Sequence, residues 1–373
     1  MTQPRWLLHL EARTLRGLIS IIQTYFSRPI HWYYSHTPLE PTARIRIPSR
    51  TSPHKGSINL VVYTPPGYQN AELTPNIKSG SVSTSTPASD SLFSIPSTSK
   101  SMPSTTLQPP QQQQKKHPVI INFHGGGFVF GTGIDDERWA RAVTESLDAI
   151  VVSVEYRLAP GYTYPTALQD SADAVAYVWE HADQWAIDRA RIATSGFSSG
   201  ANLALTVPMY LRNHTPPGLD KDVNIECAAL VAWYPGTDAT RTRDERAASM
   251  KNPTKRLPRW VTDLFDHAQP ADTQEERARD AYRSPGLAPA EFLRRCLPRH
   301  VLLYTCEHDM LCAEARRFSE RLRAEGLVER VVYHEVDGVR HAWDKGPDPR
   351  PRPEPVYREA CQRLREAFDS III

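Results

Sequence analysis

A glycine-bracketed turn around Ser198 constrains the fold more than any other stretch of this chain. The apolar run at 191–194 is typical of a buried strand, and residues 201–211 form a helix-length run with few breakers. Between them lies Gly-Phe-Ser-Ser-Gly at 196–200, so a strand must turn directly into a helix through Ser198. Glycines on both sides leave room for such a sharp turn, which exposes the serine hydroxyl above a sheet. The pattern therefore predicts that Ser198 is a nucleophile.

The rest of the chain supplies strands for that sheet. Further buried strands are predicted at 119–123, 149–154, 228–233, 301–305 and 331–336. Helical segments such as 165–185 separate them, which predicts an α/β fold with a mostly parallel, doubly wound sheet. Residues 43–48 and 57–63 alternate apolar and polar side chains, as expected of two antiparallel strands at the sheet edge. Functional groups in such sheets gather at the carboxyl ends of the strands.

Composition divides the chain into further segments. Residues 66–117 consist mainly of Ser, Thr, Pro and Gln and cannot bury enough apolar surface to offset ordering entropy, so we predict a disordered surface insertion. Residues 237–299 are highly charged, with apolar side chains at helical spacing near 260–265, and are predicted to form an inserted helical lid. The catalytic core is then predicted at 118–236 and 300–373, with the edge strands at 43–65.

Charge and cysteine content exclude several classes of partner. Lys and Arg number 44 against 42 Asp and Glu, with no basic stripe that would indicate nucleic acid. The five cysteines lack metal-ligand spacing and are expected to be reduced thiols in an intracellular compartment. No metal or cofactor is expected. An apolar stripe at 15–26 is too short to cross a bilayer, and we expect it to pack on the protein's own body rather than on a membrane.

A second glycine-rich loop follows the strand at 119–123. It reads His-Gly-Gly-Gly-Phe at 124–128, and three glycines let the backbone approach a ligand closely. In an acyl-transfer enzyme, the N–H groups of Gly125, Gly126 and Gly127, together with that of Ser199, would hold an oxyanion. The alternative is a plain glycine-rich turn. His124 is expected to be structural, bonded within its own loop.

Three polar residues at predicted strand ends occur in the order Ser198, Asp309, His341. A serine needs a base to take its proton, and histidine titrates near neutral pH. An aspartate beside it would fix the tautomer of His341 and stabilise its cation. Other residues remain possible in these roles: Glu307 and Asp337 as the acid, and His308 and His334 as the base.

These motifs together resemble the hormone-sensitive lipase-like esterases, the α/β-hydrolase fold-3 group. The resemblance rests on the segments 124–128, 156–160, 196–204, 309–311 and 341–343, and it extends from about residue 119 to the C-terminus. It implies a cytoplasmic, cofactor-free hydrolase of carboxylic esters with small to medium acyl groups. It also implies a mixed helical cap, built from N-terminal helices at 1–42 and part of 237–299.

Some positions depart from the pattern of that family. Phe197 stands where the family has a small or acidic residue, Ser199 where it has Ala, and Ala201 where it has Gly. The sequence keeps Asp309 and His341, but the residues that follow them differ from those of the family. The substrate preference of the family therefore cannot be assigned to this chain. Alternatives are a lactonase, thioesterase or dehydratase that tailors a secondary metabolite, or a non-catalytic ligand-binding member of the fold, as in plant gibberellin receptors. The presence of His341 argues against the binding member, and oligomeric state stays open.

Overall fold

The computed structural model describes residues 14, 38–69, 73, 115–266, 272–346 and 348–371. Nearly all of the predicted N-terminal cap helices, including the apolar stripe at 15–26, lie outside the described residues. So does most of the predicted insertion at 66–117. The described ends of that insertion belong to the core, because Leu73 is fully buried among core side chains and His117 begins a strand.

An eight-stranded sheet forms the centre of the described structure, in the order β1-β2-β4-β3-β5-β6-β7-β8. The strands are β1 (Ala43–Pro48), β2 (Ser57–Tyr63), β3 (His117–Phe123), β4 (Ile150–Glu155), β5 (Ile187–Phe197), β6 (Ala229–Trp233), β7 (His300–His308) and β8 (Arg330–Arg340). β1 and β2 pair antiparallel, β2 pairs antiparallel with β4, and the remaining pairs are parallel. The predicted mostly parallel sheet and its antiparallel edge strands are confirmed.

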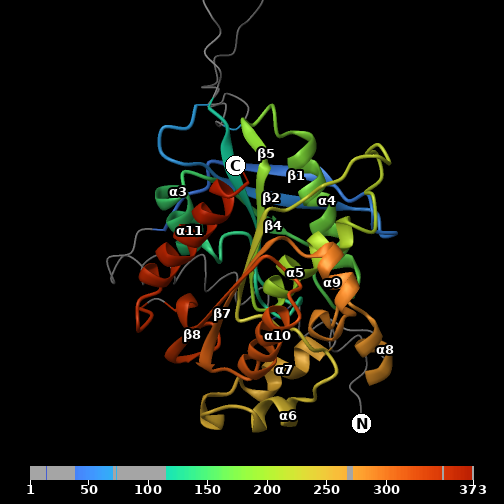
Figure 1. The fold of residues 1–373 in the computed structure, drawn as a ribbon, viewed down its shortest axis with the longest axis vertical. Coiled ribbons are helices and arrows are strands. Elements are labelled where there is room, and N and C mark those ends of the chain that lie inside the picture. Colours follow the sequence, from blue (N-terminus) through green and yellow to red (C-terminus); the bar gives the residue numbers. More distant parts are fainter. Residues whose placement is uncertain are drawn as a thin grey trace, which may run out of the picture.

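Helices cover both faces of the sheet. The larger ones are α3 (Glu137–Ser146), α4 (Thr166–Glu180), α5 (Ser199–Leu211), α10 (Cys312–Ala324) and α11 (Glu354–Asp369). Figure 1 shows α3 and α11 together on one side of the sheet, with α4, α5 and α10 on the other. Successive strand side chains alternate between the two faces: Ile120 packs in the cluster under α3 and α11, and Ile121 packs in the cluster under α4 and α5.

Short helices follow β6 in the segment predicted as a lid. They are α6 (Arg243–Ala248), η2 (Pro253–Lys255), α7 (Arg259–Asp266), α8 (Gln274–Arg279), η3 (Pro285–Leu287) and α9 (Ala290–Cys296). In Figure 1, α6, α7 and α8 gather at one end of the sheet. α9 differs from them, because its Leu293 and Cys296 are buried in a cluster with β6 and β7. The cap described below therefore consists of residues 237–266 and 272–284, and α9 packs as part of the core.

Candidate active site

Ser198 lies at the sharp turn between β5 and α5, as predicted. Its backbone has φ 54° and ψ −116°, a conformation that costs energy for any residue with a side chain. The flanking glycines are required by space: a Cβ on Gly196 would lie 2.1 Å from the carbonyl oxygen of Gly200, and one on Gly200 would lie 2.0 Å from that of Phe123. The turn therefore fixes the Ser198 side chain at the carboxyl end of the sheet.

Hydrogen bonds join Ser198, His341 and Asp309 in one chain. His341 Nε2 lies 2.9 Å from Ser198 Oγ, and His341 Nδ1 lies 2.6 Å from Asp309 Oδ2. Asp309 follows β7 and accepts a second hydrogen bond from the N–H of Leu311 at 3.0 Å. His341 follows β8. Because these strands are parallel, their carboxyl ends bring three residues that are distant in sequence to one edge of the sheet.

Burial and the carboxylate act in opposite directions on His341. Its side chain is 10% exposed and that of Asp309 is fully buried. Burial alone would lower the pKa of His341, but the charge of Asp309 and its hydrogen bond raise it, and the net pKa lies above the ordinary value of 6.5. The pair therefore stabilises a proton on the imidazole.

The alternative carboxylates lie elsewhere. Glu307 accepts a hydrogen bond from the N–H of Gly338 at 2.6 Å and pairs with Lys251 at 3.0 Å. These contacts hold the pKa of Glu307 below its usual range. Asp337 is exposed to solvent. Among the predicted acids, only Asp309 contacts His341 in the described structure.

The alternative histidines also have other partners. His334 contacts Glu359 through Nδ1 at 2.8 Å, and His308 lies 3.7 Å from Glu307. His124 is buried, donates from Nδ1 to the carbonyl oxygen of Gly125 at 2.8 Å, and stacks on Tyr156. His124 thus bonds within its own loop, as the sequence predicted.

The glycine loop at 124–128 lies against the Ser198 turn. Gly126 and Gly127 have φ values of 113° and 63°, and a Cβ on Gly125 would lie 3.5 Å from the Cβ of Ser198. The N–H of Phe128 donates to Ser199 Oγ at 3.3 Å, which ties the loop to the start of α5. A Cβ on Gly127 would lie 2.0 Å from the ring of Phe265, so the loop also packs against α7 of the cap. All four predicted oxyanion residues are therefore near Ser198.

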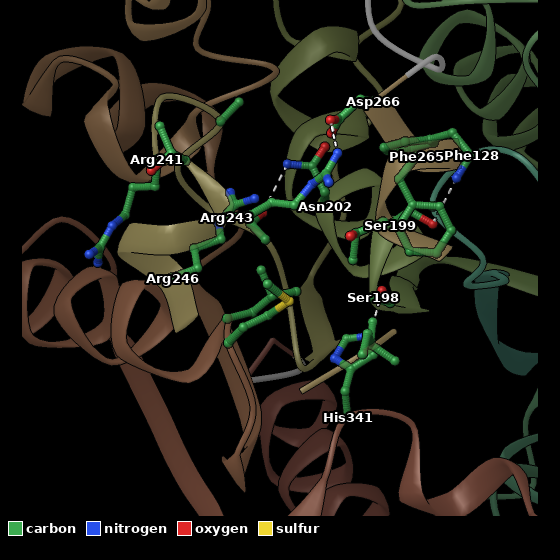
Figure 2. Close-up of a pocket in the computed structure, with 18 of the residues that line it drawn as sticks. Phe128, Ser198, Ser199, Asn202, Arg241, Arg243, Arg246, Phe265, Asp266 and His341 are labelled. Carbon is green, nitrogen blue, oxygen red and sulfur yellow. Dashed lines mark hydrogen bonds and ion pairs between the residues drawn. The ribbon is translucent and has the colours of Figure 1, made fainter. Parts of the chain in front are cut away.

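A cavity of about 700 Å³ opens between this site and the cap. Ser198, Ser199, Gly127 and His341 line its floor, and residues 239–283 of the cap line much of the rest. Figure 2 shows Ser198 and His341 facing each other, with Phe128 and Phe265 on one side and Arg241 and Arg246 on the other. The cavity is large enough for a small organic substrate.

A sequence profile described as alpha/beta hydrolase fold matches residues 120–345. The chain belongs to this family. The matched segment contains the glycine loop, the Ser198 turn and the residues Asp309 and His341. The resemblance seen in the sequence is thereby confirmed.

Curated relatives of this α/β hydrolase include two proteins of Mycobacterium tuberculosis. Esterase LipI is 29% identical over 233 residues, which cover 61% of this chain and 65% of LipI. Carboxylesterase NlhH is 32% identical over 213 residues, which cover 56% of this chain and 62% of NlhH. The match thus spans less than two thirds of each relative's own length.

The same fold occurs among solved structures. The hyperthermophilic esterase from the archaeon Pyrobaculum calidifontis superimposes with a TM-score of 0.66 over 98% of this chain and 97% of that chain, at 22% sequence identity. At this identity the likeness is one of fold, and it confirms the doubly wound architecture of this hydrolase.

The positions where this hydrolase departs from its family pattern are accommodated by packing. Phe197 is fully buried and stacks on Trp233, with ring centroids 5.7 Å apart. The ammonium group of Lys345 lies 3.3 Å from the centroid of the Phe197 ring, a cation–π contact. Ala201 is fully buried in the cluster beneath α5.

A buried charge network beneath His341 was not found from the sequence. Lys345 pairs with Asp136 at 2.6 Å and with Asp344 at 3.0 Å. Asp344 accepts hydrogen bonds from the hydroxyl groups of Tyr234 at 2.8 Å and Tyr357 at 2.5 Å. Burial alone would lower the pKa of Lys345, but the two carboxylates raise it. The network holds the segment that follows His341 to the core.

Tyr234 connects this network to His341. Its ring lies edge-on to the His341 ring, with centroids 4.8 Å apart. Its hydroxyl is held by Asp344, so the ring cannot move away without breaking that bond. A sequence signal for the network is weak, because Asp136 and Lys345 lie in polar stretches without periodicity.

Two absences hold for the part of the chain that the structure describes. It contains no group of three or more His, Cys, Asp or Glu side chains that could hold a metal ion. Its helices include none that is long and apolar enough to span a bilayer.

Proposed function

We propose that this protein is a serine hydrolase that cleaves carboxylic esters through an acyl-enzyme. The hydrogen-bonded chain from Ser198 through His341 to Asp309 is the observation that carries the proposal. The two mycobacterial relatives, which are named as esterases, support the same reaction class. The substrate would be a small-molecule ester of a small to medium acyl group, bound in the cavity under the cap.

In the proposed reaction, His341 Nε2 takes the proton from Ser198 Oγ as the oxygen attacks the ester carbonyl carbon. The tetrahedral intermediate then collapses, and His341 returns the proton to the departing alcohol. Water, activated by the same histidine, releases the acid and regenerates Ser198. Asp309 stays ionised throughout and stabilises the imidazolium form of His341, in agreement with the raised pKa.

The glycine loop and Ser199 would stabilise the oxyanion of that intermediate. No hydrogen bond within the described structure uses the backbone N–H groups of Gly126, Gly127 or Ser199. The N–H of Ser199 lies in the first turn of α5, where the helix dipole favours negative charge. Gly125 contributes by letting the loop approach Ser198 closely. Such donors are worth about 3–4 kcal/mol each where they have been removed.

The arrangement of His341 argues against a non-catalytic ligand-binding role. A binding protein has no need of a base held within hydrogen-bonding distance of an exposed serine hydroxyl. All five cysteines are free and buried, which supports a reducing compartment, and we place the protein in the cytoplasm.

Labelling with a fluorophosphonate, followed by mass mapping of the adduct, tests the proposal directly. The label should form on Ser198, and Ser198→Ala should remove it and lower turnover of p-nitrophenyl butyrate by about 10⁴-fold. Ser370→Ala, at the distant end of α11, is the matched control and should label and turn over like the wild type. A Ser198→Ala variant with a tenth of wild-type turnover would refute the nucleophile.

A further inference from the structure

The cavity above Ser198 carries an unusual excess of positive charge. Within the described residues, its lining includes seven arginines and three aspartates. All seven arginines lie in the cap, between residues 241 and 283. The chain as a whole is almost neutral, with 44 basic and 42 acidic side chains, so the excess is local to this wall.

Two of these arginines are neutralised by carboxylates of the protein. Arg243 forms ion pairs with both Asp263 and Asp266 of α7. Arg246 pairs with the fully buried Glu314 at 2.9 Å. Both side chains are therefore used to hold the cap helices to each other and to the core.

Two more serve the same structural purpose. Arg277 pairs with Asp272 at 2.9 Å, and Arg283 pairs with the other oxygen of the same carboxylate. Arg283 also lies over the ring of Tyr164, 5.2 Å from its centroid. One carboxylate, that of Asp272, thus serves two guanidinium groups.

The remaining three arginines, Arg241, Arg256 and Arg259, form no ion pair with a carboxylate of the described residues. Arg241 donates only to a backbone carbonyl, that of Glu245, at 3.2 Å. Asp244, the third lining aspartate, has no cationic partner in the described residues either, but its single negative charge offsets only part of the charge of these three arginines. The cavity wall therefore presents guanidinium groups that no carboxylate of the described residues pairs with.

Uncompensated guanidinium groups in a concave site select for anions. A guanidinium presents a planar fork of donors that matches a carboxylate in a two-bond arrangement. Concave surfaces of low dielectric also focus the field of like charges and raise the local concentration of oppositely charged ligands. The opposite wall is aromatic, with Phe128 and Phe265 beside the glycine loop (Figure 2).

From these charges we infer that the preferred substrate is an ester that also carries a free carboxylate. The carboxylate lies under the cap beside Arg241, Arg256 and Arg259, and the scissile ester lies at Ser198. This inference rests on the proposed ester hydrolysis and adds the charge class of the substrate to it.

Paired substrates that differ in charge test the inference. Mono-4-nitrophenyl glutarate and its methyl ester differ only at the remote carboxyl group, and they place the charge on the acyl side. 4-Acetoxyphenylacetate and its methyl ester place it on the alcohol side. The full-length wild type should show kcat/KM at least about tenfold higher for the charged member of one of the two pairs, and the preference should shrink in 0.5 M NaCl because exposed charges are screened.

Substitution of the three arginines locates the origin of the preference. In the variant Arg241→Gln/Arg256→Gln/Arg259→Gln, the ratio of the charged to the neutral kcat/KM should fall towards one. Arg279→Gln is the matched control, because Arg279 is an exposed cap arginine that pairs with Glu275 and does not line the cavity. It should keep the wild-type ratio. A thermal unfolding curve for each variant establishes that the cap is still folded.

The outcomes separate the two proposals. If no ester of either pair is hydrolysed and no fluorophosphonate label forms, the proposed function is wrong. If the neutral esters are hydrolysed but the charged member is never preferred, the hydrolase stands and the inference fails. The inference also fails if the wild-type preference survives unchanged in the triple arginine variant.

Discussion

Different interactions stabilise the sheet edge that carries Ser198 and the cap that covers it. Ser198, Asp309 and His341 lie at turns that follow β5, β7 and β8, and most residues of β5 and β7 are buried. The cap helices bury little: α6 and α8 contain no buried residue, and α7 contains two, Thr262 and Leu264. We therefore expect the core to determine the reaction and the cap to determine the substrate.

Local hydrogen bonds and ion pairs replace apolar burial in the cap. Capping boxes start two of its helices, with Thr242 and Glu245 in α6 and Thr273 and Glu276 in α8. The ion pairs of Arg243 join α6 to α7. Such exposed contacts contribute modestly and weaken with salt, so we expect the cap to be less stable than the sheet beneath it.

The largest effect on kcat/KM is expected from substitution of Asp309, the proposed acid at the end of β7. Asp309→Asn should lower kcat/KM for p-nitrophenyl butyrate by about 10⁴-fold, because an amide cannot hold His341 in the correct tautomer. Glu307→Gln is the matched control, since Glu307 lies two residues away and bonds Gly338 and Lys251 instead. It should remain within about threefold of the wild type. Reversed results for the two variants would assign the acid role to Glu307.

A smaller effect on kcat/KM is expected from substitution of Gly127, where the glycine loop of the core contacts Phe265 of the cap. Gly127→Ala puts a methyl group where the Phe265 ring now lies, at a backbone φ of 63° that disfavours side chains. The loop must shift, and a displaced oxyanion donor should lower kcat/KM by about 10²-fold. Adding Phe265→Ala removes the clash but not the backbone strain, so the double variant should recover part of the loss. No recovery at all would mean that cap packing has no influence on the loop.

The sequence predicted that Ser198, Asp309 and His341 lie together, but it did not predict the charges of the cap wall. The Ser198 turn and the glycine loop are local patterns with one structural solution, and strand ends can be ordered from hydrophobic runs. The wall depends on which arginines the chain itself neutralises. Arg243 finds carboxylates twenty or more residues away, whereas Arg241 finds none in the described residues. Pairing of that kind follows from the packing of short helices and leaves no periodic signal.

The buried network around Lys345 shows the same limit within the core. Its partner Asp136 lies 209 residues away in the chain. The sequence around Lys345 gives no indication that its ammonium group pairs with two buried carboxylates. The ion pair between Lys345 and Asp136 therefore forms only when folding brings the start of α3 next to the segment after β8.

A smaller change again is expected in the pH dependence of the reaction. His341 must be neutral to accept the Ser198 proton, so kcat/KM should rise with pH through the pKa of His341. Because Asp309 raises that pKa, the half-maximal value should lie above pH 6.5. In Asp309→Asn the residual activity should reach half-maximum at lower pH, since burial, which lowers the pKa of His341, is then opposed only by the weaker effect of Asp344. A wild-type midpoint clearly below 6.5 would mean that burial outweighs the carboxylate.

The smallest effect is expected from the predicted insertion, and it provides a contrast with the core around it. Removing residues 76–112 should leave turnover and the free energy of unfolding nearly unchanged, because the sequence there has no apolar periodicity and loop length affects closure entropy by only about 1 kcal/mol. The deletion keeps Leu73, which is buried in the core, and Lys115, which pairs with Asp148.

Leu73→Ala is the matched comparison for that deletion. Removing one fully buried leucine side chain should lower the free energy of unfolding by about 2–5 kcal/mol, measured by denaturant titration. One substitution at the edge of the segment should therefore cost more than the loss of its whole interior. If the deletion destabilised the protein as much as Leu73→Ala does, residues within 76–112 would have to pack on the core, and the boundary of the insertion would need to be redrawn.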